Sequence, residues 1–225
     1  MRILIIAATT SEVKSITKSN IEVGMPVNFY LVENHQTDIL VTGVGAVPTA
    51  FYLARFGDNY DFVLNVGIAG TYSDDITVGQ VVAVVQDVFG DYGIDDNGEF
   101  ISLSNAGLMD KSLIIKSDVM HNPWLANINP MSYRLVKGIT LAAASGSSDV
   151  IARNIILWNP DIETMECAAV FYSCILMKKP FLCIRAISNV VEPRDKRNWK
   201  IKESLDNLHK AIFNLLGTIS VSGLD

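Results

Sequence analysis

The chain has 225 residues, of which 49% are hydrophobic and 19% charged, and its formal net charge is −6. This length is enough for one substantial core, and we expect a single domain over residues 1–225. The negative charge and the scattered lysines and arginines argue against a nucleic-acid partner. No apolar run reaches the roughly 18 residues of a membrane span, and residues 3–8 are too few for a secretory signal. We therefore expect a cytoplasmic protein with no membrane partner.

The metal-binding residue types form no recognisable pattern. The three cysteines are odd in number and lack a C-x-x-C spacing, which predicts neither a disulfide framework nor a zinc site. His35, His121 and His209 are far apart in the sequence, and we expect them on the surface or in loops. The sequence thus predicts no metal site.

Short runs of β-branched residues alternate with helical stretches, which is typical of an α/β sheet with helices on both faces. In chain order, the predicted strands cover residues 2–7, 39–42, 62–66, 80–87, 138–143 and 181–187. The predicted helices cover residues 11–18, 47–56, 149–157, 165–177 and 201–217. Residues 88–135 are the least regular part, and we expect them to form loops over the site.

Two glycine turns follow predicted strands. Residues 43–45 read Gly-Val-Gly, but Pro48 stands where a dinucleotide fingerprint has its third glycine, and no acidic partner follows at the right spacing. Residues 67–70 read Gly-Ile-Ala-Gly. Each turn either brings the backbone close to a small ligand or is only a tight turn between elements. Taken alone, each is better interpreted as a tight turn.

A buried carboxylate is expected at the head of the helix over residues 165–177. This helix has almost no polar face, so Glu166 should be buried, although a first-turn glutamate in solvent is the ordinary alternative. The next strand carries Arg185 among apolar residues, where an unpaired cation would be costly. We expect Glu166 and Arg185 to pair, directly or through water. A carboxylate at this place can hold ribose hydroxyls, because the helix dipole and free N–H groups keep it ionised.

Several motifs together resemble the nucleoside phosphorylase and nucleosidase superfamily. They are the first strand with Glu12, the turns at 43–45 and 65–70, the segment 78–82, Met165-Glu166, and Arg-Ala-Ile-Ser-Asn at 185–189. The similarity extends to about residue 201. Within the superfamily, residues 184–195 with 199–201 are most similar to the futalosine hydrolase family, while the better-known relatives are methylthioadenosine/S-adenosylhomocysteine nucleosidases.

The resemblance implies a three-layer α/β/α fold around a mixed sheet. It implies hydrolysis of futalosine to hypoxanthine and dehypoxanthine futalosine, a step of menaquinone biosynthesis, with water as the nucleophile and no cofactor. It also implies a homodimer or a higher homo-oligomer. One departure from the relatives is Cys167, where a small glycine or alanine is usual.

The resemblance assigns roles by position in the motifs. Glu12 corresponds to the residue that orients and deprotonates the attacking water, and Glu166 to the one that holds the ribose hydroxyls. Arg185 supports this network of water and carboxylates. Ser188 and Asn189 lie where the relatives contact the imidazole edge of the purine. The other expected substrate-binding residues are Met165, which packs on the sugar, Val44, Gly67, Ile68, Ala69, Gly70, Arg194 and Arg197.

The amide of Asn189 favours a 6-oxopurine. Cleavage of an N-ribosidic bond develops oxocarbenium character on the sugar and negative charge on the departing base. An amide NH₂ group can donate to N7 and O6 together, whereas a protonated Asp suits a 6-aminopurine. Loop backbone groups could override this preference, and Asn after Ser also occurs in plain structural turns.

Three alternatives stay open. A purine nucleoside phosphorylase of the hexameric type has arginines where this chain has residues 7–10 and Asn65, and the Glu12 anion would repel phosphate. A methylthioadenosine/S-adenosylhomocysteine nucleosidase is the second alternative. The third is a nucleoside-binding sensor without activity, which the presence of Glu12, Glu166 and Arg185 disfavours.

Overall fold

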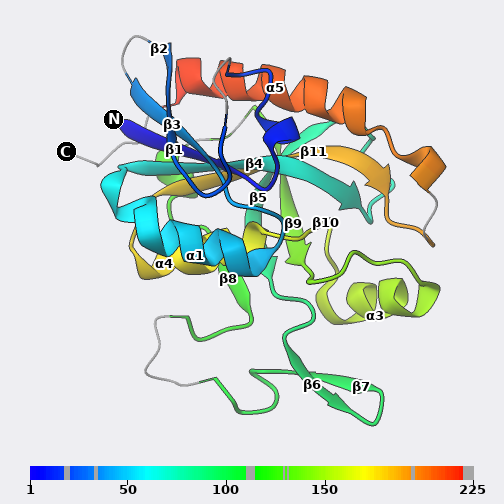
Figure 1. The fold of residues 1–225 in the computed structure, drawn as a ribbon. Helices are drawn as coiled ribbons and strands as arrows, with labels where there is room; N and C mark the ends of the chain where they lie inside the picture. Colours follow the sequence, from blue (N-terminus) through cyan, green and yellow to red (C-terminus); the bar gives the residue numbers. More distant parts are fainter. Residues whose placement is uncertain are drawn as a thin grey trace.

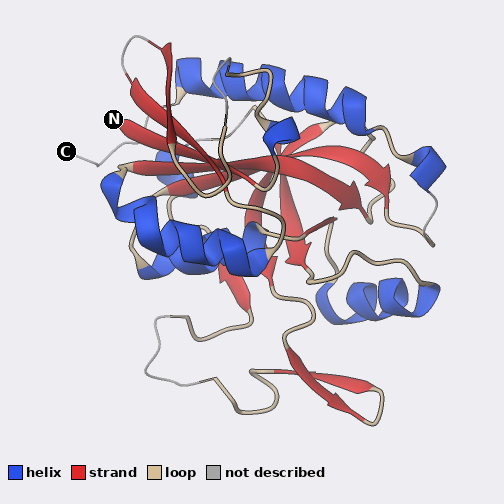
Figure 2. Cartoon of the chain, viewed as in Figure 1, coloured by secondary structure: helices blue, strands red, loops and turns tan. Residues whose placement is uncertain are grey.

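The computed structural model describes residues 1–17, 21–32, 35–109, 115–128, 130, 132–193 and 196–219, with the side chains of 29–32 and 196 left out. A mixed sheet forms the middle layer, with strand order β10-β9-β5-β11-β4-β1-β3-β2 and β8 paired to β5. Figure 1 shows helix α5 on one face of this sheet and helices α1 and α4 on the other. The predicted three-layer α/β/α fold is confirmed, and Figure 2 shows the strands enclosed between helices.

The bounds of the elements are as follows. The strands of the main sheet are β1 (Arg2–Ala7), β2 (Val27–Val32), β3 (His35–Val41), β4 (Phe62–Thr71), β5 (Val81–Val88), β8 (Val119–His121), β9 (Arg134–Thr140), β10 (Ile162–Thr164) and β11 (Phe181–Val190). A separate hairpin is made by β6 (Gly93–Asp96) and β7 (Glu99–Ser102). The helices are α1 (Ala46–Phe56), α2 (Leu125–Ile128), α3 (Ser148–Trp158), α4 (Cys167–Leu176) and α5 (Ile201–Thr218), with 3-10 turns η1 (Thr10–Glu12), η2 (Gly57–Asn59) and η3 (Lys196–Asn198).

The apolar first strand is buried on both faces. Successive side chains of a strand point to opposite sides of the sheet. Ile3 and Ile5 of β1 therefore pack in the cluster beneath α5, with Ile212, while Leu4 and Ile6 pack in the cluster on the side of α1 and α4. A continuous apolar run is what a parallel strand covered by helices on both faces requires, and β1 pairs in parallel with β3 and β4.

Two element predictions are wrong, and two strands were missed. The helix predicted at 11–18 is only the short turn η1, although Thr9 and Glu12 form a capping box at its start. The strand predicted at 138–143 lies earlier, at β9. The sequence missed β2 and β10, since β10 has only three residues and β2 is an edge strand whose pairing with β3 is irregular.

Residues 88–135 do not simply form loops over the site. Their described part holds the hairpin β6–β7, the strand β8 and the short helix α2. Figure 1 shows the hairpin at the lower margin of the molecule, away from the sheet. None of the described residues between 88 and 135 lines the cavity that collects the predicted site residues.

Within the described ranges, no helix has the length and apolar character that crossing a membrane demands. The same part of the chain contains no group of three or more His, Cys, Asp or Glu side chains that could hold a metal ion. The expected cytoplasmic location, the absence of a nucleic-acid partner and the single domain stay predictions.

Candidate active site

A cavity of about 360 Å³ lies where β1, β4 and β11 end. These three strands are parallel, so their carboxyl ends meet at one edge of the sheet, where α/β folds commonly bind ligands. Strand β10 runs against β4 and closes the same edge. The predicted site residues that line this cavity are Glu12, Val44, Ile68, Ala69, Gly70, Met165, Glu166, Ser188 and Asn189.

Glu12 is held directly after the first strand. Its Oε2 accepts hydrogen bonds from the Thr9 backbone N–H at 2.8 Å and the Thr9 hydroxyl at 3.1 Å, and its Oε1 accepts one from the Ile68 N–H at 3.3 Å. The side chain is only 6% exposed. Burial raises the pKa of Glu12, while the hydrogen bonds from Thr9 and the charge of Arg185 lower it in part. The carboxylate is thus positioned and primed to accept a proton.

Gly67 makes room for Glu12 instead of lining the cavity. A Cβ atom at this position would lie 2.8 Å from Glu12 Oε1 and 3.4 Å from Arg185 Nε. The residue is buried beneath the carboxylate and does not line the cavity, and its expected contact with substrate stays a prediction. The absence of a side chain is what lets the carboxylate and the guanidinium approach β4.

Glu166 is the N-cap residue of α4, one position before the helix begins. Its Oε1 accepts a hydrogen bond from the Gly45 N–H at 2.9 Å, and Gly45 is in turn the N-cap residue of α1. The carboxylate is 9% exposed and lies at the N-termini of two helices, α1 and α4. The first-turn N–H groups of α4 are satisfied by the hydroxyls of Thr164 and Thr140. The Gly-Val-Gly turn therefore holds Glu166.

Arg185 makes no direct hydrogen bond to Glu166, and the pairing through water that was also expected stays a prediction. Its guanidinium donates to the side-chain oxygen of Asn65, to the Asn65 carbonyl at 3.3 Å and to the Ile184 carbonyl at 2.8 Å. The only direct ion pair among the described residues joins Arg2 to Asp61. Arg185 is 1% exposed, and its Nε has no hydrogen-bond partner among the residues that the structure describes. Asn65, which the sequence indicated only as a departure from phosphorylases, accepts two of its three hydrogen bonds.

Asn189 presents a hydrogen-bond donor to the cavity. Its Nδ2 donates to the Val190 carbonyl at 2.9 Å, and its Oδ1 accepts from the Ser188 hydroxyl at 2.8 Å. A carbonyl oxygen can only accept, so Val190 fixes which end of the amide is nitrogen. Nδ2 also lies 3.2 Å from the place where Gly70 would carry a Cβ atom. The second amide hydrogen thus remains available above Gly70.

The sequence missed several residues of the cavity wall. Trp199 supplies a large aromatic surface there, and its signal was present in the segment 199–201, which the resemblance quoted without giving it a role. Glu163 and Ser145 line the cavity as well, and no sequence motif indicated them. Their position follows from the pairing of β10 with β4, a strand far away in the sequence.

The two arginines expected to bind substrate have different outcomes. Arg194 lies outside the described residues. Arg197 is exposed in η3 and does not line the cavity. His209 lies half-buried on α5, with Nε2 3.1 Å from the backbone oxygen of Glu12.

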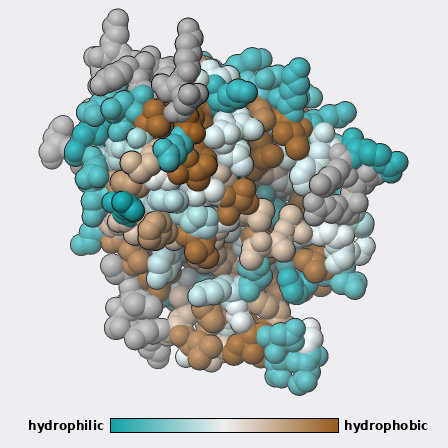
Figure 3. Space-filling model, in the orientation of Figure 1, coloured by the Kyte–Doolittle hydropathy of each residue, from teal (hydrophilic) through white to brown (hydrophobic). Residues whose placement is uncertain are grey.

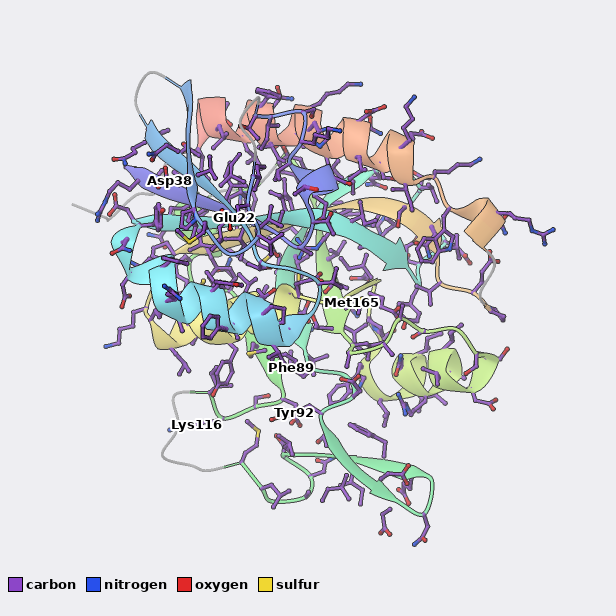
Figure 4. The ribbon with its side chains drawn as sticks, viewed as in Figure 1. Glu22, Asp38, Phe89, Tyr92, Lys116 and Met165 are labelled. Atoms are coloured by element: carbon purple, nitrogen blue, oxygen red, sulfur yellow. The ribbon has the colours of Figure 1, made fainter. Side chains whose placement is uncertain are left out.

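A second cavity, of about 610 Å³, adjoins the first and shares Val44 and Met165 with it. Figure 4 shows Met165, Phe89 and Tyr92 in a row that leads from the start of α4 toward the β6–β7 hairpin. Phe89 and Tyr92 line this second cavity together with residues of α1. Met165 therefore separates the two spaces.

Known proteins share the sequence pattern and the fold of this chain. A family model for the phosphorylase superfamily matches residues 2–219. The futalosine hydrolase of Thermus thermophilus is 26% identical over 79% of this chain and 80% of its own length. The 5'-methylthioadenosine/S-adenosylhomocysteine nucleosidase of Psychromonas ingrahamii is 27% identical over 89% of this chain and 90% of its own.

A solved structure agrees with the fold. The 5'-methylthioadenosine/S-adenosylhomocysteine nucleosidase of Neisseria meningitidis, in complex with methylthio-immucillin-A, superimposes with a TM-score of 0.78 at 16% identity. The match covers 96% of this chain and 98% of that structure. With the family model extending over nearly the whole chain, this chain belongs to the phosphorylase superfamily.

Proposed function

We propose that the chain is a nucleosidase that hydrolyses the N-ribosidic bond of a 6-oxopurine nucleoside, with futalosine as its substrate. The observation that carries the proposal is the meeting of Glu12, Glu166 and the donor end of Asn189 in one cavity. The similarity to the Thermus thermophilus futalosine hydrolase supports this choice of substrate.

In the proposed reaction, water attacks C1' of the ribose while the bond from C1' to the purine nitrogen breaks. Glu12 takes a proton from the water, a role that its buried carboxylate and raised pKa favour. Glu166 accepts hydrogen bonds from the ribose hydroxyls, and Met165 packs on the sugar. The electron pair of the broken bond leaves with the purine. Asn189 donates the hydrogen that Val190 does not use to the edge formed by N7 and O6, where the negative charge develops.

Water is favoured over phosphate as the nucleophile. None of the described residues that line the cavity is a lysine or an arginine. Asn65 is engaged with Arg185, and the Thr9 groups are engaged with Glu12, so neither is free to cradle an anion. An ionised Glu12 in this place would repel phosphate but can accept a proton from water.

The test is incubation with futalosine, inosine and methylthioadenosine, each with and without phosphate, followed by assay of the released base. We expect hypoxanthine from futalosine at a rate independent of phosphate. Release that requires phosphate would show a phosphorylase. Faster release of adenine from methylthioadenosine would assign the chain to the other nucleosidase. Binding without any release would show a sensor.

We propose further that Arg194 and Arg197 bind the benzoate carboxylate of futalosine, since a guanidinium pairs with a carboxylate in a fork. Both follow the strand that carries Asn189. Replacing each by alanine should lower turnover of futalosine but not of inosine, which lacks the carboxylate. Equal losses on the two substrates would remove these arginines from the recognition of futalosine.

We also propose that a second copy of this chain covers the apolar face beside the site. Val47 and Phe51 of α1 are 82% and 57% exposed, and Tyr172 of α4 lines the second cavity. Figure 3 shows brown hydrophobic side chains among polar ones on the face that α1 occupies. Val47→Glu should convert a dimer to a monomer in sedimentation. A parent chain that sediments as a monomer and keeps full activity would contradict the dimer.

A further inference from the structure

Glu163 and Asn189 flank the same glycine. Strand β10 pairs antiparallel with β4 so that Glu163 lies opposite Gly70, and β11 pairs in parallel on the other side so that Asn189 lies opposite Gly70 as well. Directly opposed residues of paired strands point to the same face of the sheet. Neighbouring strands are about 4.8 Å apart, so the two backbones stand about 10 Å apart with no side chain between them. All three residues line the site cavity.

The groups around Glu163 fix it as a hydrogen-bond acceptor. Its Oε1 accepts from the Ser145 N–H at 2.8 Å, and its Oε2 accepts from the hydroxyls of Ser145 and Tyr72, each at 2.5 Å. The Asn154 amide donates to the oxygens of both hydroxyls, at 3.1 and 3.2 Å. Each hydroxyl hydrogen is therefore directed at Glu163. The carboxyl group of Glu163 thus faces three donors from the protein.

The carboxylate has capacity left on the cavity side. An ionised carboxyl group offers about four lone-pair sites, and three are used by Ser145 and Tyr72. Glu163 is 8% exposed, and that exposure is toward the cavity it lines. A ligand that binds here has to offer a hydrogen-bond donor to Glu163. Without one, the remaining lone pairs of the carboxyl group would be buried without a partner.

We propose that Glu163 determines base specificity by accepting the N1–H of a 6-oxopurine. This inference rests on the proposed function and identifies the second purine-reading group of the same site. In a 6-oxopurine the acceptors N7 and O6 adjoin the donor N1–H, which matches the donor of Asn189 and the acceptor of Glu163. In a 6-aminopurine both positions are mismatched, because C6 carries a donor and N1 carries a lone pair.

The test is calorimetric binding of hypoxanthine, 1-methylhypoxanthine and adenine to the parent chain, to Glu163→Gln and to Ser145→Ala. The parent should bind hypoxanthine about 10- to 100-fold more tightly than either other base. Adenine also lacks a hydrogen on N1 but carries no methyl group there, so it controls for the size of the methyl group in 1-methylhypoxanthine. Glu163→Gln should lose most of this preference. Ser145→Ala, which removes a donor to Glu163 but keeps the carboxylate, should retain it.

Several results would overturn the inference. A preference unchanged in Glu163→Gln would show that the carboxylate does not read the base, and an equal collapse in Ser145→Ala would show a purely structural network. If Glu163→Gln does not fold, the parent decides alone, because equal binding of hypoxanthine and 1-methylhypoxanthine excludes an N1–H contact. If the chain hydrolyses futalosine but does not distinguish the three bases, the inference fails and the proposed function holds. If it distinguishes the bases but releases them only with phosphate, the proposed function fails and the inference holds.

Discussion

The backbone N–H of Gly45 donates a hydrogen bond of 2.9 Å to Oε1 of Glu166, although 121 residues separate the two in the sequence. This contact joins the N-terminus of α1 to the N-cap of α4 and places the carboxylate in the wall of the cavity. The glycine turn and the acidic residue, which the sequence shows as separate motifs, are parts of one site.

Replacing Glu12 by Gln should remove turnover while substrate affinity stays near the parent value. The amide keeps the shape and part of the hydrogen bonding to Thr9 and Ile68 but cannot take a proton from water. Loss of a general base lowers the rate by about 10²- to 10⁴-fold. Single-turnover kinetics with futalosine measure the effect, and turnover at the parent rate would rule out Glu12 as the base.

The rate should fall as the pH is lowered through the pKa of Glu12, because only the ionised carboxylate accepts a proton. Burial raises this pKa, so the acid limb of the kcat/KM profile should lie at a higher pH than for an ordinary glutamate. Thr9→Val removes a hydrogen bond that lowers the pKa, and should move the limb further toward neutral pH. Thr9→Ser is the matched control. An acid limb that does not move in Thr9→Val would contradict this assignment.

Replacing Glu166 by Gln should damage sugar binding and rate together, by about 10- to 100-fold, since hydrogen bonds to charged groups contribute about 1.5–3 kcal/mol. A 2'-deoxynucleoside provides the decisive comparison. The parent should be less active on the 2'-deoxynucleoside than on the ribonucleoside. Glu166→Gln should show little difference between the two substrates, because it already lacks the contact to the 2'-hydroxyl. Independent, additive losses would mean that Glu166 does not hold the 2'-hydroxyl.

Gly67→Ala should lower kcat by more than its loss of stability, measured as the melting temperature, can explain. The new methyl group would lie 2.8 Å from Glu12 Oε1 and displace the carboxylate. Gly217→Ala in α5 is the control, since a Cβ atom there meets nothing within 4 Å. Alanine in a helix should leave activity unchanged and stability equal or higher. Full activity in Gly67→Ala would show that Glu12 does not need its observed position.

Asn189→Asp should shift base preference from hypoxanthine toward adenine nucleosides, at a large cost in absolute activity. An ionised Asp faces O6 and N7 with lone pairs only, and each unmade hydrogen bond costs about 1–3 kcal/mol. A protonated Asp regains both contacts with a 6-aminopurine. The measurement is kcat/KM for futalosine and its 6-amino counterpart in both chains. An unchanged ratio would mean that Asn189 does not read the base.

Much of the fold could be predicted from local pattern. The run from Ile3 to Ala8 reads as a strand buried on both faces, and β1, α1, α3 and α5 lie within a residue or two of their predicted bounds. Elements with a local signal were found, whereas β10, with three residues, was not. The predicted helix at 11–18 ends after the single turn η1, even though its capping box, the local start signal, is present.

The sequence by itself indicated three of the side chains that line the cavity, because motif positions identified Glu12, Glu166 and Asn189. Only the tertiary structure decided their partners and the rest of the wall. Arg185 donates to Asn65 instead of Glu166, and Glu163 comes to lie beside Gly70. The physical reason is that these contacts depend on the register between strands distant in the sequence, and on which of several nearby donors a buried charge can reach. Neither leaves a periodic trace along the chain.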